Sequence, residues 1–222
     1  WWNRKKDIRV GDIIEIQRAG DVIPQITKVI NKPQTRGQKI TFPNNCPVCG
    51  SKTVKEKDQA VLRCENIMNC EAQILGRLKH FVSKKSLNID GFGEKQIIQF
   101  WKLGFIKNYT DIFKLNKYRK NIIQLEGWGE ISYKNLLTAI ENSKKVEFNK
   151  FIYSLGIRFV GETISMLLAK EFIKTRFFLD SINKNKKLLN INGLGPKVID
   201  SIISYFQNKA NKEIVLKLDN IL

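Results

Sequence analysis

Ile191-Asn192-Gly193-Leu194-Gly195 is one of three nearly identical stretches that decide the fold of this 222-residue chain. The others are Ile89-Asp90-Gly91-Phe92-Gly93 and Leu125-Glu126-Gly127-Trp128-Gly129, and a looser version runs Leu155-Gly156-Ile157-Arg158-Phe159-Val160-Gly161. The last glycines of the four stretches follow one another at intervals of 36, 32 and 34 residues. A spacing this regular indicates a repeated structural unit.

Each stretch is followed by apolar residues at helical spacing, which predicts a tight turn leading into a helix. After Gly195 these residues are Val198, Ile199, Ile202, Ile203 and Phe206. A single Gly-x-Gly before a helix is also a common plain connection between two helices. Four copies in register favour a helix-hairpin-helix array.

The glycine hairpins predict binding to a nucleic-acid backbone. Glycine has no Cβ, so the hairpin backbone can approach a phosphate closely, and the first amides of the following helix form an anion site. Contacts to phosphates do not read the base sequence. For Lys197 the alternative is an ordinary solvated lysine. The candidate contacts are Gly91, Gly93, Gly127, Gly129, Arg158, Gly161, Gly193, Gly195 and Lys197.

Composition agrees with a polyanionic partner. The chain has 39 Lys and Arg against 21 Asp and Glu, a formal charge of +18. No run of about 18 apolar residues and no secretory signal is visible, so we expect a cytoplasmic protein that binds duplex or nicked DNA and no membrane.

All four cysteines lie between residues 46 and 70, in the spacing C-x2-C-x14-C-x5-C. Two such pairs predict a closed structural Zn²⁺ site, with Cys46, Cys49, Cys64 and Cys70 as its ligands. Two disulfides or a redox C-x-x-C are the alternatives, and a basic cytosolic chain without a surrounding βαβ pattern disfavours both.

The chain is expected to be mainly α. Residues 12–30 alternate partly and are rich in β-branched residues, which predicts strands, whereas the sequence reads as helical from Ala72 onward. The β segment resembles the C-terminal strands of an incomplete barrel. The expected domains are this incomplete barrel at 1–40, which the family resemblance described below implies to be the C-terminal part of an OB fold, a four-cysteine zinc finger at 41–72 and a tandem helix-hairpin-helix domain at 73–222.

Several stretches form a recognisable series along the chain. They are Asp7-Ile8-Arg9-Val10-Gly11-Asp12, Arg18-Ala19-Gly20-Asp21-Val22-Ile23-Pro24, Cys46-Pro47-Val48-Cys49-Gly50-Ser51, Arg63-Cys64-Glu65-Asn66, Cys70-Glu71-Ala72-Gln73, His80-Phe81-Val82-Ser83, Asn88-Ile89-Asp90-Gly91-Phe92-Gly93 and Leu155-Gly156-Ile157-Arg158-Phe159-Val160-Gly161-Glu162. The series resembles the C-terminal portion of bacterial NAD-dependent DNA ligases, with their OB domain, zinc finger and helix-hairpin-helix domain, over residues 7–210.

The resemblance implies the clamping part of an enzyme that seals nicks in duplex DNA, in replication and repair. That reaction proceeds through adenylation of a lysine from NAD, transfer of AMP to the 5′-phosphate and attack by the 3′-hydroxyl. The resemblance also implies that Arg18 and the loop at Val22 and Ile23 lie against the minor groove near the nick.

The family's adenylation motif, Lys-x-Asp-Gly, has no counterpart here. The nearest match is Asn88-Ile89-Asp90-Gly91, and asparagine has no amine to carry AMP. No catalytic residue is therefore expected in this chain. NAD and Mg²⁺ would be bound only in the complete ligase, by an adenylation domain of the same or a split polypeptide. The alternative function is a stand-alone, non-enzymatic zinc and helix-hairpin-helix DNA-binding protein.

Two aromatic side chains had competing interpretations. His80, the one histidine of the chain, is expected to pack between helices or face a phosphate rather than act as a fifth zinc ligand or as a general base. Trp128 lies at a hairpin tip, where it would either stack on a base or contribute to the core.

Overall fold

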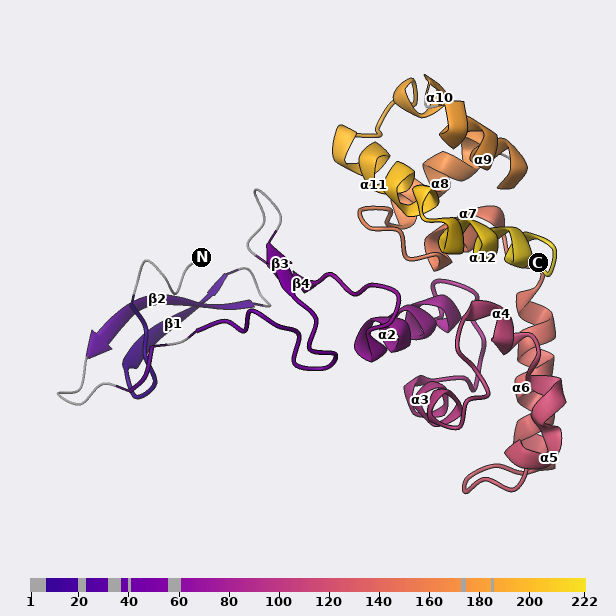
Figure 1. The fold of residues 1–222 in the computed structure, drawn as a ribbon, viewed down its shortest axis with the longest axis horizontal. Coiled ribbons are helices and arrows are strands. Elements are labelled where there is room, and N and C mark those ends of the chain that lie inside the picture. The colour runs from indigo at the N-terminus through magenta and orange to yellow at the C-terminus, as the bar shows by residue number, and fades with distance from the viewer. Residues whose placement is uncertain are drawn as a thin grey trace. The chain divides into compact units, whose positions relative to one another are not determined.

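The structure is a computed structural model that describes residues 7–19, 23–31, 37–39, 41–55, 61–172, 175–184 and 186–222. The chain divides into two compact units, residues 1–70 and residues 71–222 (Figure 1). The finer division into a partial OB fold, a zinc finger and a helical domain stays a prediction.

The first unit contains two small antiparallel sheets. Strand β1 (Ile13–Ala19) pairs with β2 (Ile23–Asn31), and irregularities in the register interrupt the pairing at Ile13/Ile14 and Glu15/Ile16. Strand β3 (Thr53–Lys55) pairs with β4 (Leu62–Cys64). The β structure expected within residues 12–30 is confirmed for the described part of that segment. The sequence Ala19-Gly20-Asp21 also predicts a turn between the strands, and its last two residues lie outside the described part of the chain.

The second unit is helical, as the sequence predicted. Among its described residues, no helix is long and apolar enough to cross a membrane. Its elements, in chain order, are α2 (Glu71–Val82), α3 (Glu94–Lys102), α4 (Tyr109–Ile112), the 3₁₀ helix η1 (Leu115–Tyr118), α5 (Arg119–Ile122), α6 (Glu130–Ser143), α7 (Phe148–Ser154), α8 (Glu162–Glu171), α9 (Thr175–Lys184), α10 (Lys186–Leu189), α11 (Pro196–Gln207) and α12 (Lys209–Asp219).

One continuous apolar core holds the helices together. The ring of Phe100 in α3 is fully buried and lies 5.5 Å from Phe92, 5.6 Å from Phe105 and 5.1 Å from Trp128, measured between ring centroids. Helices distant in sequence also meet, since α12 contacts α4 and α2 contacts α7 (Figure 1). Trp128 therefore contributes to the core, one of the two roles that its place in the hairpin allowed.

The segment between α3 and α6 is more broken than the sequence pattern indicated. Gly104, at φ +75°, follows the end of α3, and its amide donates to the carbonyl of Trp101 at 3.0 Å. Asn108 then starts α4 by accepting from the amide of Thr110 at 2.9 Å. Helix capping thus ends α3 and starts α4, and η1 and α5 follow without a side-chain N-cap.

Candidate nucleic-acid interface and metal centre

The four sequence stretches form four equivalent turns in the helical unit. In each turn the amide of the fourth residue donates to the carbonyl of the first, the hydrogen bond that closes a β-turn. The N···O distances are 3.3 Å for Phe92 to Ile89, 3.0 Å for Trp128 to Leu125, 3.0 Å for Val160 to Ile157 and 3.2 Å for Leu194 to Ile191. The looser third stretch therefore folds like the other three.

The third residue of every turn has a positive φ, which is the requirement of a type II turn. Glycine fills this position in three turns, at φ +72° for Gly91, +78° for Gly127 and +95° for Gly193. In the third turn the position is taken by Phe159, at φ +62°. A non-glycine residue in this region costs about 1–2 kcal/mol, so Phe159 is the one strained member of the set.

Gly156 does not perform the role of the turn glycine in the third hairpin. It follows the C-cap of α7, Leu155, with φ +64°, and its amide donates to the carbonyl of Tyr153 at 3.1 Å. This is the usual position of a glycine that ends a helix.

The glycine directly after each turn is the N-cap of the helix that follows, and all four N-caps have extended backbones. Each N-cap carbonyl accepts the first hydrogen bond of its helix. The donors are Ile97 to Gly93 at 3.0 Å, Tyr133 to Gly129 at 3.0 Å, Ser165 to Gly161 at 2.9 Å and Ile199 to Gly195 at 3.2 Å. A glycine N-cap lacks the side-chain acceptor that Ser or Asp would offer to the first amides, so these can bind an external anion.

Within the described part of the chain, no contact requires glycine at these N-caps. A Cβ added at Gly129, Gly161 or Gly195 would meet no atom within 4 Å, and at Gly93 it would meet only the Oε1 of Gln96, at 3.4 Å. Their φ angles are negative, so other residues could adopt the same backbone. The close approach of a phosphate is a reason for glycine that the chain's own packing does not provide.

The first residue of the helix distinguishes the fourth hairpin from the other three. Helices α3, α6 and α8 begin with a glutamate, whereas α11 begins with Pro196, followed by the exposed Lys197. Each glutamate is ion-paired to a basic residue. The pairs are Glu94 with Lys79, Glu130 with Arg119 at 2.6 Å and Glu162 with Lys85 at 2.6 Å.

The first two hairpins border a shared cavity of about 470 Å³. Asp90 and Gly91 line it from the first turn and Gly127 and Trp128 from the second, and Ser132 adds a hydroxyl. The indole Nε1 of Trp128 donates to Gln99 Oε1 at 3.1 Å, which ties the second turn to α3. These two turns are therefore neighbours in space as well as in sequence.

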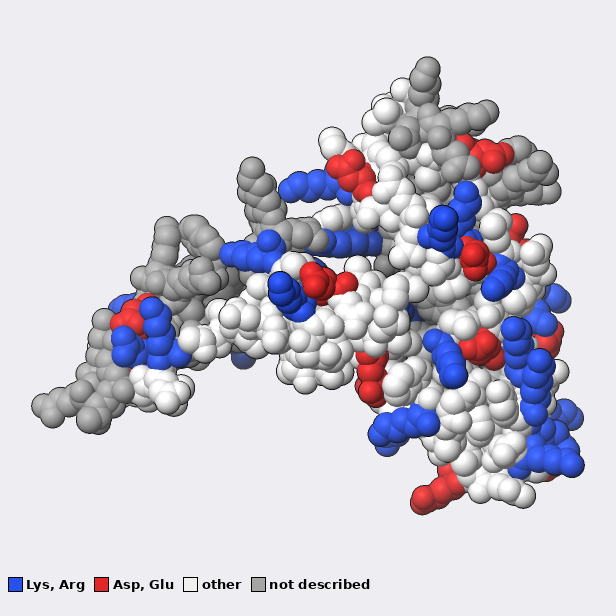
Figure 2. Space-filling view, in the orientation of Figure 1, with Lys and Arg blue, Asp and Glu red and all other residues white. Residues whose placement is uncertain are grey.

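The remaining expected DNA contacts are less concentrated. Arg158 is half-buried, and its guanidinium carbon lies 4.6 Å from the ring centroid of Phe159. In the first unit, Arg18 is an exposed residue of β1 and Ile23 begins β2, while Val22 lies outside the described residues. Basic side chains spread over the face drawn in Figure 2, with acidic ones among them, rather than gathering in one patch.

His80 has a packing role. Its Nε2 lies 2.7 Å from the carbonyl oxygen of Tyr153, and the two rings are 4.7 Å apart between centroids. The contact joins α2 to α7 across 73 positions of sequence. Sequence reasoning left packing as one of two roles for this histidine, and it offered no signal that would identify Tyr153 as the partner.

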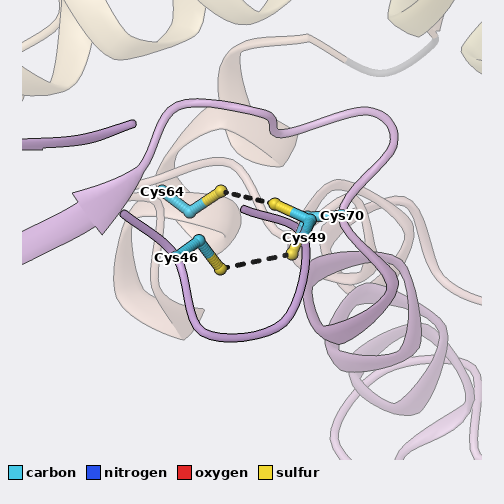
Figure 3. A group of neighbouring side chains, drawn as sticks. All are labelled: Cys46, Cys49, Cys64 and Cys70. Carbon is cyan, nitrogen blue, oxygen red and sulfur yellow. Dashed lines mark hydrogen bonds between the residues drawn. The ribbon is translucent and has the colours of Figure 1, made fainter. Parts of the chain in front are cut away.

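The four cysteines converge in the first unit, next to the start of α2 (Figure 3). Their Sγ atoms all lie within 4.8 Å of one another, with 4.0 Å between Cys46 and Cys70 and 3.4 Å between Cys49 and Cys64. A tetrahedral zinc site with Zn–S bonds of about 2.3 Å places its sulfurs about 3.8 Å apart. The cluster fits zinc, and all four thiols are free rather than paired in disulfides.

The local backbone explains why the first cysteine pair points at one centre. The amide of Gly50, at φ +72°, donates to the carbonyl of Cys46 at 2.9 Å, and the amide of Cys46 donates to Ser51 at 2.7 Å. Hydrogen bonds from the Ser51 hydroxyl and amide lower the pKa of the Cys49 thiol to about 6. Desolvation raises the pKa of the Cys64 thiol to about 11. Zinc would be held structurally by these four thiolates, because no position is left open for a substrate.

Comparisons with known proteins agree with both sites. The family model "NAD-dependent DNA ligase C4 zinc finger domain" matches residues 45–72, and the model "Helix-hairpin-helix motif" matches residues 150–215. The second match contains the third and fourth turns, and the first contains all four cysteines.

Curated relatives match nearly the whole chain. A protein named DNA ligase from Pelagibacter ubique is 44% identical over 98% of this chain, and one from Rickettsia canadensis is 41% identical over 98%. A DNA ligase from Wolbachia pipientis subsp. Culex pipiens is 43% identical over 94%. The matched region is 33%, 34% and 32% of these relatives, so the chain spans about a third of their length.

Proposed function

The chain belongs to the NAD-dependent DNA ligases by its zinc finger and its helix-hairpin-helix region, and from this premise we propose that it is a DNA-clamping part of an enzyme that seals nicks. It binds the phosphate backbone of duplex or nicked DNA without reading the sequence. In the cell this activity belongs to replication and repair in the cytoplasm.

The proposal rests on the four glycine N-caps, each of which directly follows a turn closed by the same backbone hydrogen bond. Their negative φ angles and the open space at three of their Cβ positions leave the repeated choice of glycine without an internal cause. A phosphate oxygen that approaches the first amides of a helix supplies that cause, and the positive end of the helix dipole favours it.

The net charge of +18 supports the same partner, since a protein that displaces counterions from DNA needs an excess of Lys and Arg. Among the hairpins, the fourth is the strongest candidate for a phosphate contact. Pro196 takes the place of the first-turn glutamate of the other three helices, and Lys197, one residue later, adds a positive charge to the first turn of α11.

The chemistry of sealing is proposed to lie with another domain of the same or a separate polypeptide. That domain would carry the adenylated lysine and bind NAD and Mg²⁺. Within this chain, Asn88 stands where the nearest motif match would need the lysine. It is exposed, at φ +51°, and immediately precedes the first hairpin. The chain's own contribution is therefore to hold the duplex.

The test replaces Gly195 by aspartate and, as a matched control, by asparagine. Both residues are good N-caps, and the extended backbone at φ −75° and ψ 157° suits them, so the fold is expected to stay intact. Only aspartate places a negative charge at the anion site. We expect Gly195→Asp to weaken binding of the full chain to a fluorescein-labelled duplex about tenfold more than Gly195→Asn does.

Fluorescence anisotropy with two duplexes of unrelated sequence measures both affinities. Equal affinity of the aspartate and asparagine variants would mean that no phosphate lies at this N-cap. Failure of the unaltered chain to bind either duplex would refute the DNA-clamping function itself.

A further inference from the structure

Phe159 is the one large side chain at the third position of the four turns. Phe159 is 47% exposed, whereas the first and fourth residues of the turn, Ile157 and Val160, are only 3% and 5% exposed. The backbone at Phe159 has φ +62°, a conformation that the other three turns adopt with glycine. Position 159 therefore has an exposed aromatic side chain although its positive φ is unfavourable for phenylalanine.

The third turn is held firmly against the rest of the helical unit. Gly156 packs beneath His80, whose Cδ2 lies 3.4 Å from where a glycine Cβ would be, and His80 itself contacts the Tyr153 carbonyl. The first residue of α8, Glu162, is ion-paired with Lys85. The backbone on both sides of Phe159 is thus attached to neighbouring elements of the helical unit.

The core does not account for this ring. Among the described residues, Phe159 is not part of the apolar cluster of the helical unit. At the equivalent positions, a Cβ on Gly91 or Gly127 would meet nothing within 4 Å, whereas one on Gly193 would meet the Cδ1 of Leu167 at 3.2 Å. The neighbour that the structure does give Phe159 is the guanidinium of Arg158, 4.6 Å above the ring. An exposed aromatic and a cation stacked on it form a surface with one apolar and one positive component.

We infer that Phe159 is a DNA-contacting side chain, with its ring packed on the sugar or base edge beside the phosphate held at the Gly161 N-cap. This inference rests on the DNA-clamping function proposed above and adds a side-chain contact to a backbone one. Aromatic and apolar side chains next to arginine are a recurrent means of contacting the minor groove, whose walls are apolar sugars and whose potential is negative.

The two kinds of contact leave different signatures in salt. Removing a phosphate contact lowers the steepness with which affinity falls as salt rises, by about one unit of slope. Removing an uncharged ring lowers affinity at every salt concentration and leaves the slope unchanged, because no counterion is released at that contact.

The experiment compares Phe159→Gly and Phe159→Asn with the unaltered full chain. Glycine restores the residue of the other three turns, and asparagine tolerates positive φ without an aromatic ring. Leu103→Ala is the matched control, since Leu103 is also 47% exposed but lies at the end of α3 away from its hairpin. Anisotropy with a labelled duplex, at several salt concentrations, reports affinity and slope, and thermal unfolding reports the fold.

We expect both Phe159 variants to bind duplex DNA about tenfold more weakly with an unchanged salt slope, and Phe159→Gly to unfold at the same temperature or higher. Leu103→Ala should bind normally. Unchanged affinity of Phe159→Gly in a chain that otherwise binds DNA would overturn the inference and leave the phosphate clamp standing. If the unaltered chain binds no duplex, the clamp and the inference fall together.

Discussion

The four-cysteine module at residues 45–70 and the helical unit at 71–222 are stabilised by different means. Among the described residues of the first unit, the buried apolar side chains are Ile8, Cys46 and Cys70. The helical unit contains one continuous cluster that includes nine aromatic rings among its buried members. The comparison teaches that a short segment with almost no apolar core can be positioned by a metal, whereas the helical array depends on apolar burial.

Removing the metal tests this contrast with the largest expected effect. Cys64→Ser leaves three thiolates, and structural zinc contributes an apparent free energy of about 10–16 kcal/mol to the folding of such modules. We expect the zinc content measured by mass spectrometry to fall from one per chain, and amide exchange to accelerate across residues 42–75 while helices α3 to α12 stay protected.

Val48→Ser, an exposed position between the first two cysteines, is the control and should keep its zinc. Full zinc content in Cys64→Ser would contradict the four-thiolate site. Equal loss of protection in the helical unit would mean that the two units do not fold independently.

The complementary substitution disturbs the helical unit and leaves the zinc ligands intact: Phe100→Ala, in the centre of the helical core. Truncation of a fully buried phenylalanine costs about 3–5 kcal/mol, because the surrounding rings cannot close the cavity. Urea denaturation followed by circular dichroism should show this loss, with one zinc still bound at low urea. Release of zinc at the same urea concentration as the helical transition would contradict the separate stabilisation of the two units.

A finer contrast exists within the first, second and fourth hairpins, between the turn glycine and the N-cap glycine. Gly127 has φ +78°, so Gly127→Ser should destabilise the helical unit by about 1–2 kcal/mol. Gly129 has an extended backbone with open space at its Cβ, so Gly129→Ser should change stability by only a few tenths of a kcal/mol. Urea denaturation measures the free energy of unfolding of both variants. Equal losses of stability in Gly127→Ser and Gly129→Ser would contradict the roles of turn glycine and N-cap glycine.

The repeated turn could be predicted from sequence because its chemistry is local. The spacing of Gly129 and Gly195 before apolar residues at helical intervals identified the turn and the following helix, and the structure confirms both. The cysteine spacing predicted a four-thiolate cluster for the same reason, since a C-x2-C pair bends into one centre through its own backbone hydrogen bonds.

The third hairpin shows where sequence reasoning stopped. Its glycines are Gly156 and Gly161, and only the structure reveals that the first of these ends α7 while Phe159 takes the turn position. A backbone angle that a phenylalanine rarely adopts has no signature in a single sequence. The contact of His80 with Tyr153 was equally hidden, because it depends on how α2 and α7 meet in three dimensions.

The central claim is that the helical array binds the phosphates of duplex DNA, and the salt dependence of duplex binding tests it most directly. If each of the four hairpins neutralises about two phosphates, the logarithm of the affinity should fall with the logarithm of the salt concentration at a slope of about −7, for duplexes of any sequence. A slope near zero, or a strong preference for one base sequence, would contradict it.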